Sequence, residues 1–94
     1  MLLADSCFNI THESFKKDLS RVISDANRND VGYFFAPSCN LRDMNTIISL
    51  SKEYPNIYAG IGIHPHYASE FKTDILIELE KFILEPKVVA IGEI

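Results

Sequence analysis

Side chains able to bind a metal ion or a phosphate follow each of four apolar segments of this sequence. The most distinctive is Glu93, which comes directly after the run Val88-Val89-Ala90-Ile91-Gly92. That run predicts a strand buried on both faces. A carboxylate placed beside it should be neutralised, paired or bound to a metal, because burying an unpaired charge is costly. Glu93 is therefore a candidate metal ligand, and the alternative is an exposed carboxylate at a frayed terminus.

A second candidate is the pair His64 and His66, in the segment Gly62-Ile63-His64-Pro65-His66. Pro65 fixes its own backbone and restricts the residue before it. On an extended course both imidazoles point the same way, and such a pair can bind a metal or a phosphate. The alternative is that one histidine bonds to the loop backbone while the other is solvated. Spacing alone favours this alternative, because two histidines are short of a closed metal site.

A third group of polar side chains lies near the N-terminus. Asp5, Cys7 and Asn9 alternate with period two, so an extended chain would place them on one face. Asn9 offers a neutral oxygen to a hard cation or to a bound water. Cys7 has no second thiol nearby, and we expect both Cys7 and Cys39 to be buried thiols in a reducing compartment.

Composition limits the classes of protein that this chain can represent. The 94 residues are 47% hydrophobic and 23% charged, which is typical of one small globular domain. The net charge of -4, with no basic cluster beyond Lys16-Lys17, argues against binding nucleic acid by phosphate neutralisation alone. A metal ion could supply the missing charge. No apolar window could span a membrane and no signal-peptide pattern opens the chain, so we expect a cytoplasmic protein.

Four strand-like runs alternate with three segments of helical period, and this alternation predicts an α/β fold with parallel strands. The predicted strands are Leu2 to Asp5, Gly32 to Ala36, Ile57 to Ile63 and Val88 to Ile91. The predicted helices are Phe15 to Ala26, a segment capped by Asn40 and ended by Pro55, and Ile75 to Ile83. A barrel and an open doubly wound sheet both fit. In either, the candidate side chains gather at the carboxyl ends of the strands.

Four motifs in their order along the chain resemble one known family. They are Asp5-x-x-x-Asn9-Ile10-Thr11 with Phe15, Tyr54-Pro55-Asn56-Ile57-Tyr58, Gly62-Ile63-His64-Pro65-His66 and Val88-Val89-Ala90-Ile91-Gly92-Glu93. Together they are similar to the N-terminal portion of the TatD family of metal-dependent deoxyribonucleases, and closest to the TatD branch itself. The resemblance runs from Leu2 to Ile94. It implies the N-terminal half of a (β/α)8 TIM barrel of the metal-dependent hydrolase type, with about four parallel strands and three helices.

The resemblance also implies roles for individual residues. Glu93 becomes the metal ligand and catalytic carboxylate at the end of the fourth strand, and His64, His66 and Asn9 become contacts to the substrate. Many members carry a metal-binding His-x-His pair where this chain has Cys7 and Asn9, which implies fewer protein ligands. The later ligands of the family, two histidines and an aspartate, have no counterpart in this sequence.

The activity implied is hydrolysis of phosphodiester bonds in DNA, single-stranded or at 3′ ends, by a metal-activated water. The ion implied is Mg²⁺, with Mn²⁺ or Zn²⁺ as alternatives. Family members have about 260 residues, an ordinary barrel length. We therefore expect residues 1–94 to be a single partial domain, a truncated part of such a nuclease and inactive alone. The alternatives are a non-catalytic interaction module, or two copies that pair their open half-barrels.

Overall fold

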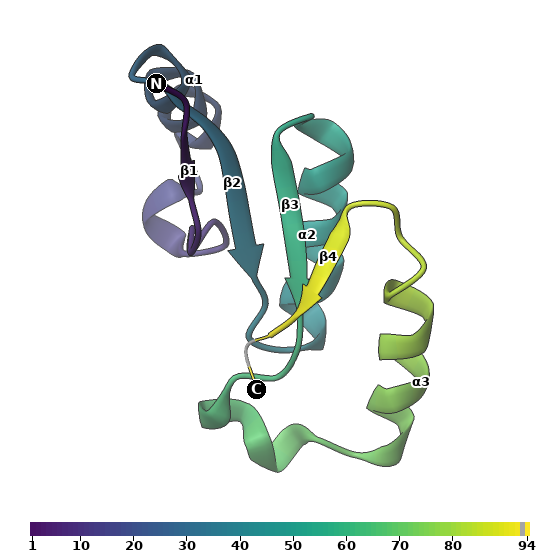
Figure 1. Ribbon diagram of the computed structural model, residues 1–94. Coiled ribbons are helices and arrows are strands. Elements are labelled where there is room, and N and C mark those ends of the chain that lie inside the picture. The colour runs from purple at the N-terminus through teal and green to yellow at the C-terminus, as the bar shows by residue number, and fades with distance from the viewer. Residues whose placement is uncertain (93) are drawn as a thin grey trace.

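The computed structural model describes residues 1–92 and 94, so the predicted ligand Glu93 lies outside the described residues. Four strands form one sheet in the order β1-β2-β3-β4 (Figure 1). Their bounds are β1 Leu3–Asp5, β2 Val31–Pro37, β3 Ile57–Ile61 and β4 Val88–Ile91. Each strand pairs with the next in parallel, which confirms the predicted α/β fold.

Helices join the consecutive strands and lie on one side of the sheet (Figure 1). The described residues form α1 Leu19–Arg28, α2 Leu41–Glu53 and α3 Thr73–Phe82, with the short 3₁₀ segments η1 Glu13–Phe15 and η2 Pro65–Glu70. Right-handed crossovers place successive helices on the same face when the sheet always grows in one direction. The strand order therefore produces a singly wound, barrel-type arrangement and not an open sheet covered on both faces.

Two buried clusters hold the helices to the sheet. The first lies between α1, α2, β2 and β3 and contains Phe8, Ile10, Ile23, Phe34, Ala36, Ile47, Ile57 and Ala59. The second joins α2 and α3 to β3 and the segment after it, and contains Met44, Ile48, Ile61, Ile63 and Ile75. Helix α2 contributes to both clusters, so all three helices pack against the same face.

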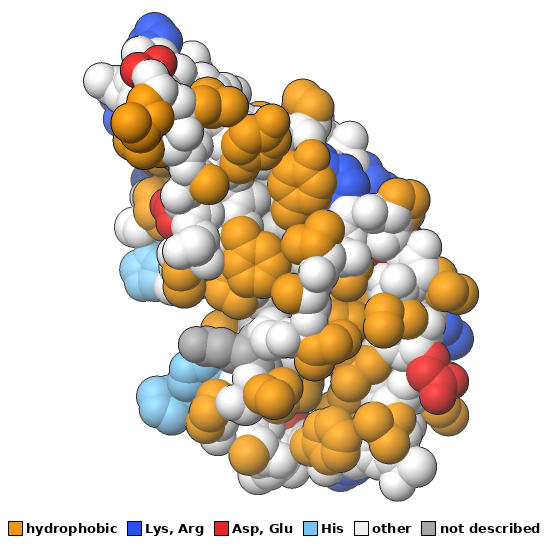
Figure 2. Space-filling view, viewed as in Figure 1, with side chains coloured by type: hydrophobic (Ala, Val, Ile, Leu, Met, Phe, Trp, Pro, Cys, Tyr) orange, Lys and Arg blue, Asp and Glu red, His pale blue; other side chains and the backbone are white. Residues whose placement is uncertain are grey.

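The opposite face of the sheet is apolar and uncovered in the described part of the chain. Figure 2 shows hydrophobic side chains spread across it. The rings of Tyr33 and Tyr58 lie 6.3 Å apart on neighbouring strands, and Tyr33 is 48% exposed. The ring of Phe35 covers Gly60, because a β-carbon added to Gly60 would lie 2.5 Å from Phe35 Cζ. In a closed barrel this face points inward.

The first helix begins later than its hydrophobic stripe predicts. The stripe starts at Phe15, but Phe15 belongs to η1, where the side chain of the cap residue His12 accepts a hydrogen bond from the backbone N–H of Ser14. Helix α1 starts only after the cap residue Asp18. The ring of Phe15 still packs edge-on against Phe8, with ring centroids 5.1 Å apart. The residues of the stripe therefore pack into one core, although they do not belong to one continuous helix.

The prediction that the last strand is buried on both faces is wrong for the described structure. Val89 and Ile91 in β4 are 57% and 55% exposed. Strand β4 is an edge of the sheet, and no further described strand pairs with its outer side. The predicted end of the third strand is also two residues too late, since β3 ends at Ile61. None of the described helices is long and apolar enough to cross a membrane.

Lys87 connects the loop before β4 to the end of α2 through hydrogen bonds. Its Nζ donates hydrogen bonds of 2.7 Å to the carbonyl oxygens of Ser51 and Tyr54, and lies 4.9 Å from the centroid of the Tyr58 ring. The carbonyl groups that a helix leaves unpaired at its end are satisfied here by one ammonium group. Burial lowers the pKa of Lys87 from its ordinary value of 10.5. Its contribution to stability therefore rises with pH between that lowered value and 10.5.

We expect Lys87→Met to lower the free energy of unfolding by about 1–2 kcal/mol, because two partly buried carbonyl groups lose their donor. Urea unfolding of the gene product measures this difference. The matched control is Lys52→Met, since Lys52 is 63% exposed and forms only a 3.3 Å ion pair with Glu85. An exposed pair of this kind contributes about 0–1 kcal/mol. Equal losses in both variants would contradict the role given to Lys87.

Candidate active site

The described candidate residues follow the strands in the sequence, and all four strands end at one edge of the sheet, its carboxyl edge (Figure 1). Backbone hydrogen bonds continue past the strand ends and hold the following segments together. Phe8 N–H donates to the carbonyl of Phe35 at 2.9 Å, and Gly92 N–H donates to that of Ile61 at 2.8 Å. The segments after the strands therefore form one connected edge, as the alternation of strands and helices predicts.

His64 and His66 form a pair at this edge, after β3. Their ring centroids are 4.6 Å apart, and the ring planes are inclined by 60°. His64 Nδ1 accepts a 3.0 Å hydrogen bond from the backbone N–H of His66, and His64 caps η2. A backbone N–H can only donate, so the neutral His64 ring carries its proton on Nε2. His64 is half-buried and His66 is exposed. One ring thus bonds to the loop backbone and the other is solvated, and the binding role of the pair stays a prediction.

The loop with the two histidines is hydrogen-bonded to the segment that follows β2. Ser38 is fully buried, and its hydroxyl contacts the backbone of Gly62. The N–H of His64 donates a 2.7 Å hydrogen bond to the carbonyl of Cys39. Asn40, the predicted cap of the second helix, is confirmed, because its side chain accepts a 2.9 Å hydrogen bond from the N–H of Asp43. The segments that follow β2 and β3 are therefore joined directly by hydrogen bonds.

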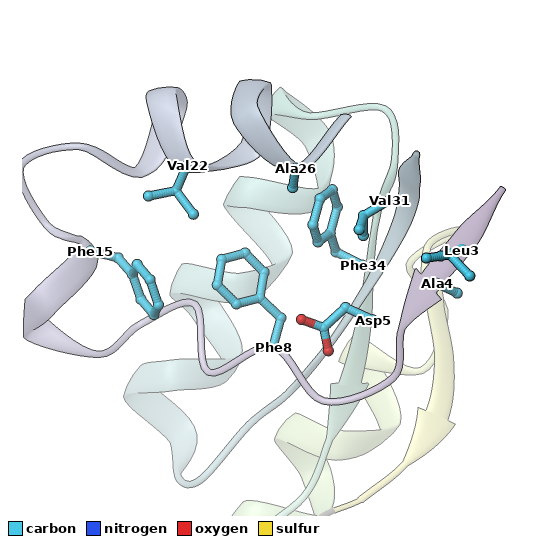
Figure 3. A pocket seen from close by; sticks show the side chains of 9 residues that line it. All are labelled: Leu3, Ala4, Asp5, Phe8, Phe15, Val22, Ala26, Val31 and Phe34. Atoms are coloured by element: carbon cyan, nitrogen blue, oxygen red, sulfur yellow. The ribbon is translucent and has the colours of Figure 1, made fainter. Parts of the chain in front are cut away.

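The N-terminal segment departs from its prediction, because β1 ends at Asp5 and the period-two alternation ends with it. Asp5 lies level with Phe34 and lines a hollow of about 550 Å³ between β1, β2 and α1 (Figure 3). Figure 3 shows its carboxylate turned toward Phe8 and Phe34, on the helix side. Asp5 Oδ1 accepts a 3.0 Å hydrogen bond from the N–H of Cys7, which turns the chain.

The expected burial of both thiols is also wrong. Cys7 is exposed and Cys39 is half-buried, while the core positions nearby are occupied by Phe8 and Ile10. Asn9 is exposed as well. It follows β1, two strands away from the histidine pair, and neighbouring strands are about 4.8 Å apart. The structure therefore puts Asn9 at the same edge as the histidines and does not bring it into one cluster with them.

Comparison with known proteins identifies the family. The profile described as TatD related DNase matches residues 4–94, nearly the whole chain. The chain belongs to this family. It is 31% identical over 86 residues to the 3′-5′ ssDNA/RNA exonuclease TatD of Erwinia tasmaniensis, and 29% identical over 85 residues to that of Escherichia coli K12. Each match covers 90% of this chain and 33% of the relative, so the chain spans about a third of the relatives' length.

The fold is also similar to that of a solved structure from the same family. The crystal structure of YJJV, a TatD homolog from Escherichia coli K12, superposes with a TM-score of 0.81 at 26% sequence identity. The match covers 98% of this chain and 36% of the YJJV chain. The four strands and their one-sided helices are therefore the N-terminal half of a TatD-type (β/α)8 barrel, as the motifs predict.

The described residues of this TatD-family chain do not complete a metal centre. Among residues 1–92 and 94, no three His, Cys, Asp or Glu side chains come close enough together to hold an ion. The predicted shared face of Asp5 and Asn9 is not formed, since Asp5 turns toward the helix side while Asn9 is exposed. Glu93 lies outside the described residues, so its role as a ligand stays a prediction.

The motifs singled out in the sequence did not include Asp43. Asp43 Oδ2 accepts a 3.2 Å hydrogen bond from the N–H of Cys39, so this carboxylate supports the segment that bonds to His64. The pattern Asn40-x-x-Asp43 is close to a capping box, in which an acidic side chain at the third helical position reaches back to the chain before the helix. That pattern could have identified Asp43.

Proposed function

We propose that this chain forms the half of a metal-dependent nuclease that presents the histidine pair to the substrate. The substrate would be single-stranded DNA, and cleavage would proceed from the 3′ end. The observation that carries the proposal is the fixed pair His64 and His66 at the carboxyl edge of a half-barrel that belongs to the TatD family. In barrels of this type, substrates bind at that edge. The names of the relatives, which are ssDNA/RNA exonucleases, agree with this substrate class.

The chemistry of the side chains fits a phosphate group. The N–H of the exposed His66 ring can donate a hydrogen bond to a phosphate oxygen, and the half-buried His64 ring lies beside it with its Nδ1 bonded to the loop backbone. Asn9, exposed at the same edge, can donate a hydrogen bond through its side-chain amide to another phosphate of the same DNA strand. A net charge of -4 leaves the phosphate charge to be neutralised mainly at the site itself.

A divalent ion, Mg²⁺ with Mn²⁺ or Zn²⁺ as alternatives, would supply that charge and activate the attacking water. We assign Glu93 as its ligand and as the catalytic carboxylate, on the motif Ala90-Ile91-Gly92-Glu93. The described residues do not complete the donor set, so the other ligands would come from outside this segment. We also propose a cytoplasmic location, which agrees with two cysteines that are not joined in a disulfide.

The proposed activity is tested on a single-stranded oligonucleotide labelled at its 5′ end, with the gene product that contains this chain. We expect a ladder of products shortened from the 3′ end in the presence of Mg²⁺ or Mn²⁺, and no cleavage after chelation. A full-length substrate after prolonged incubation with each ion would contradict the proposal. The 94-residue chain, assayed beside a barrel-length version, tests whether this segment acts alone, and we expect it to be inactive.

Removing either histidine should weaken transition-state binding. We expect His66→Ala to lower kcat/KM about 10-fold, which is typical of losing one hydrogen bond to a charged group. His64→Ala should lower it further, because the hydrogen bond that orders the N–H of His66 is lost as well. The matched control is His12→Ala, since His12 lies before η1 and its ring contacts the hydroxyl and the N–H of Ser14. A His12 variant as impaired as the other two would count against a specific role for the pair.

A second candidate function is a non-catalytic interaction module, in which two copies of the chain pair. The observation that favours it is the uncovered apolar face, where Tyr33 is 48% exposed, together with the edge residues Val89 and Ile91. Exposed apolar faces and unpaired strand edges promote association. Sedimentation velocity of the 94-residue chain tests this idea, and a monomer at every concentration would remove it.

A further inference from the structure

We propose that Ser38 is a positioning residue of the nuclease site, because its hydroxyl fixes, through Gly62, the loop that presents His64 and His66. This inference rests on the proposed function for its catalytic consequence. Its structural part, the orientation of the His64 ring, is measured separately. Ser38 directly follows β2, whereas the histidines follow β3, and Ser38 is buried.

The contact between Ser38 and Gly62 is unusually complete for one side chain. The hydroxyl donates a 3.1 Å hydrogen bond to the carbonyl of Gly62 and accepts one of 2.9 Å from its N–H. Ser38 is 0% exposed, so water cannot replace either bond. Strand β3 ends at Ile61, one residue before Gly62. The hydroxyl therefore bonds to the N–H and carbonyl of Gly62 as the backbone of a neighbouring strand would. These two bonds fix the direction in which the chain leaves the sheet toward His64.

Further hydrogen bonds strengthen the same connection. The N–H of Ser38 donates to the carbonyl of Gly60 at 3.1 Å, so Ser38 is itself held against β3. The carbonyl of the next residue, Cys39, accepts from the N–H of His64 at 2.7 Å. Asp43 at the start of α2 in turn holds the N–H of Cys39. The histidine loop is thus tied to β2 and α2, and its last bond, from His66 N–H to His64 Nδ1, sets the ring.

Replacing Ser38 with alanine removes both bonds to Gly62 and leaves a buried N–H and a buried carbonyl without their partner. We expect the loop to move until these groups find others, and the hydrogen bond onto His64 Nδ1 to weaken. The nitrogen chemical shifts of the His64 ring should then change from one Nε2–H tautomer to a mixture of tautomers. For single-stranded DNA, kcat/KM should fall about 10- to 100-fold, as is usual when a group that orients a site residue is lost.

The matched control is Ser51→Ala in α2. Ser51 is the other buried polar residue of the described chain, at 4% exposure, and its hydroxyl donates a 2.7 Å hydrogen bond to the carbonyl of Ile48 in the same helix. It is also a buried serine whose hydroxyl bonds to the backbone, and the partner of that hydroxyl lies in its own helix and not in the histidine loop. In the Ser51→Ala protein we expect the His64 ring signals to be unchanged and kcat/KM to stay within about twofold of the parent value.

The experiment uses the isotopically labelled gene product, with ring spectra and kinetics recorded well below the melting temperature of every variant. If Ser38→Ala does not fold, Ser38→Cys serves instead, because a thiol of similar size makes weaker hydrogen bonds. It should change the ring signals and kcat/KM in the same direction, to a smaller extent.

The outcomes distinguish a failure of the positioning role of Ser38 from a failure of the proposed nuclease function. Altered His64 signals and reduced kcat/KM in the Ser38 variants, but not in Ser51→Ala, support the positioning role. Unaltered signals with unchanged kcat/KM overturn it, and so does an equal effect in the control. If the ring signals change while the parent protein cleaves no DNA, the positioning of the loop stands and the proposed nuclease function fails.

Discussion

Glu93→Gln should lower kcat/KM for cleavage of single-stranded DNA by about a thousandfold in the gene product that contains this chain. A neutral amide of the same shape cannot match the charge with which a carboxylate binds a divalent ion. A thousandfold loss corresponds to about 4 kcal/mol of transition-state stabilisation. Because the ion itself should bind more weakly, raising the Mg²⁺ concentration should recover part of the lost rate. A metal titration of initial rates for both proteins measures the two effects together.

The control for this substitution is Glu80→Gln, at an exposed position of α3. It makes the same change of charge away from the candidate site, so any loss caused by net charge alone appears in both variants. We expect its kcat/KM and its metal dependence to stay within about twofold of the parent values. A Glu93→Gln protein that cleaves at the parent rate would rule out Glu93 as the metal ligand.

Ile61→Ala should lower the free energy of unfolding by about 2–5 kcal/mol, the usual range for truncating a buried isoleucine. Ile61 is 1% exposed and lies in the cluster that joins β3 to α2 and α3, with Met44 and Ile63. Such a loss is a large fraction of the 5–15 kcal/mol that stabilises an ordinary domain. Ile61 shares its cluster with Ile63, the residue before His64, so activity should decline at temperatures where the parent protein is still folded.

Urea unfolding of the gene product measures this loss. Two further variants test whether the loss depends on the size and the burial of the truncated side chain. Ile61→Val removes one methylene group and should cost about 0.5–1.5 kcal/mol. Ile77→Ala in α3 truncates a side chain that is 55% exposed, and it should change stability by less than about 0.5 kcal/mol. If Ile61→Ala and Ile77→Ala cost the same, the second cluster does not hold the sheet to its helices as described.

The pattern of the sequence was sufficient for the order of the elements. Alternating apolar runs and helical stripes predicted four parallel strands and three helices, and the bounds of β4 agree with the prediction. The cap Asn40 and the stop at Pro55 placed α2 correctly, because both act within a few residues of themselves. The motifs in their order were also sufficient for the family, which the profile match over residues 4–94 confirms.

Local pattern failed where a contact distant in the sequence decides the outcome. Phe15 continues the stripe of α1 yet lies in η1, because its ring packs against Phe8. The alternation of Asp5, Cys7 and Asn9 holds only while a strand continues, and β1 ends at Asp5. Val89 and Ile91 are as apolar as a buried strand requires, but burial depends on a neighbouring element, and the described β4 is an edge.

The sequence by itself determined that the chain builds the N-terminal half of a TatD-type barrel, and that His64, His66 and Asn9 follow its strands. Element order and motif chemistry depend on residues close together along the chain, so a pattern can report them. Only the tertiary structure showed that Ser38 holds Gly62, 24 residues away, and that the His64 ring is set by the N–H of His66. Such bonds depend on which strand ends become neighbours, and the sheet alone brings those ends together.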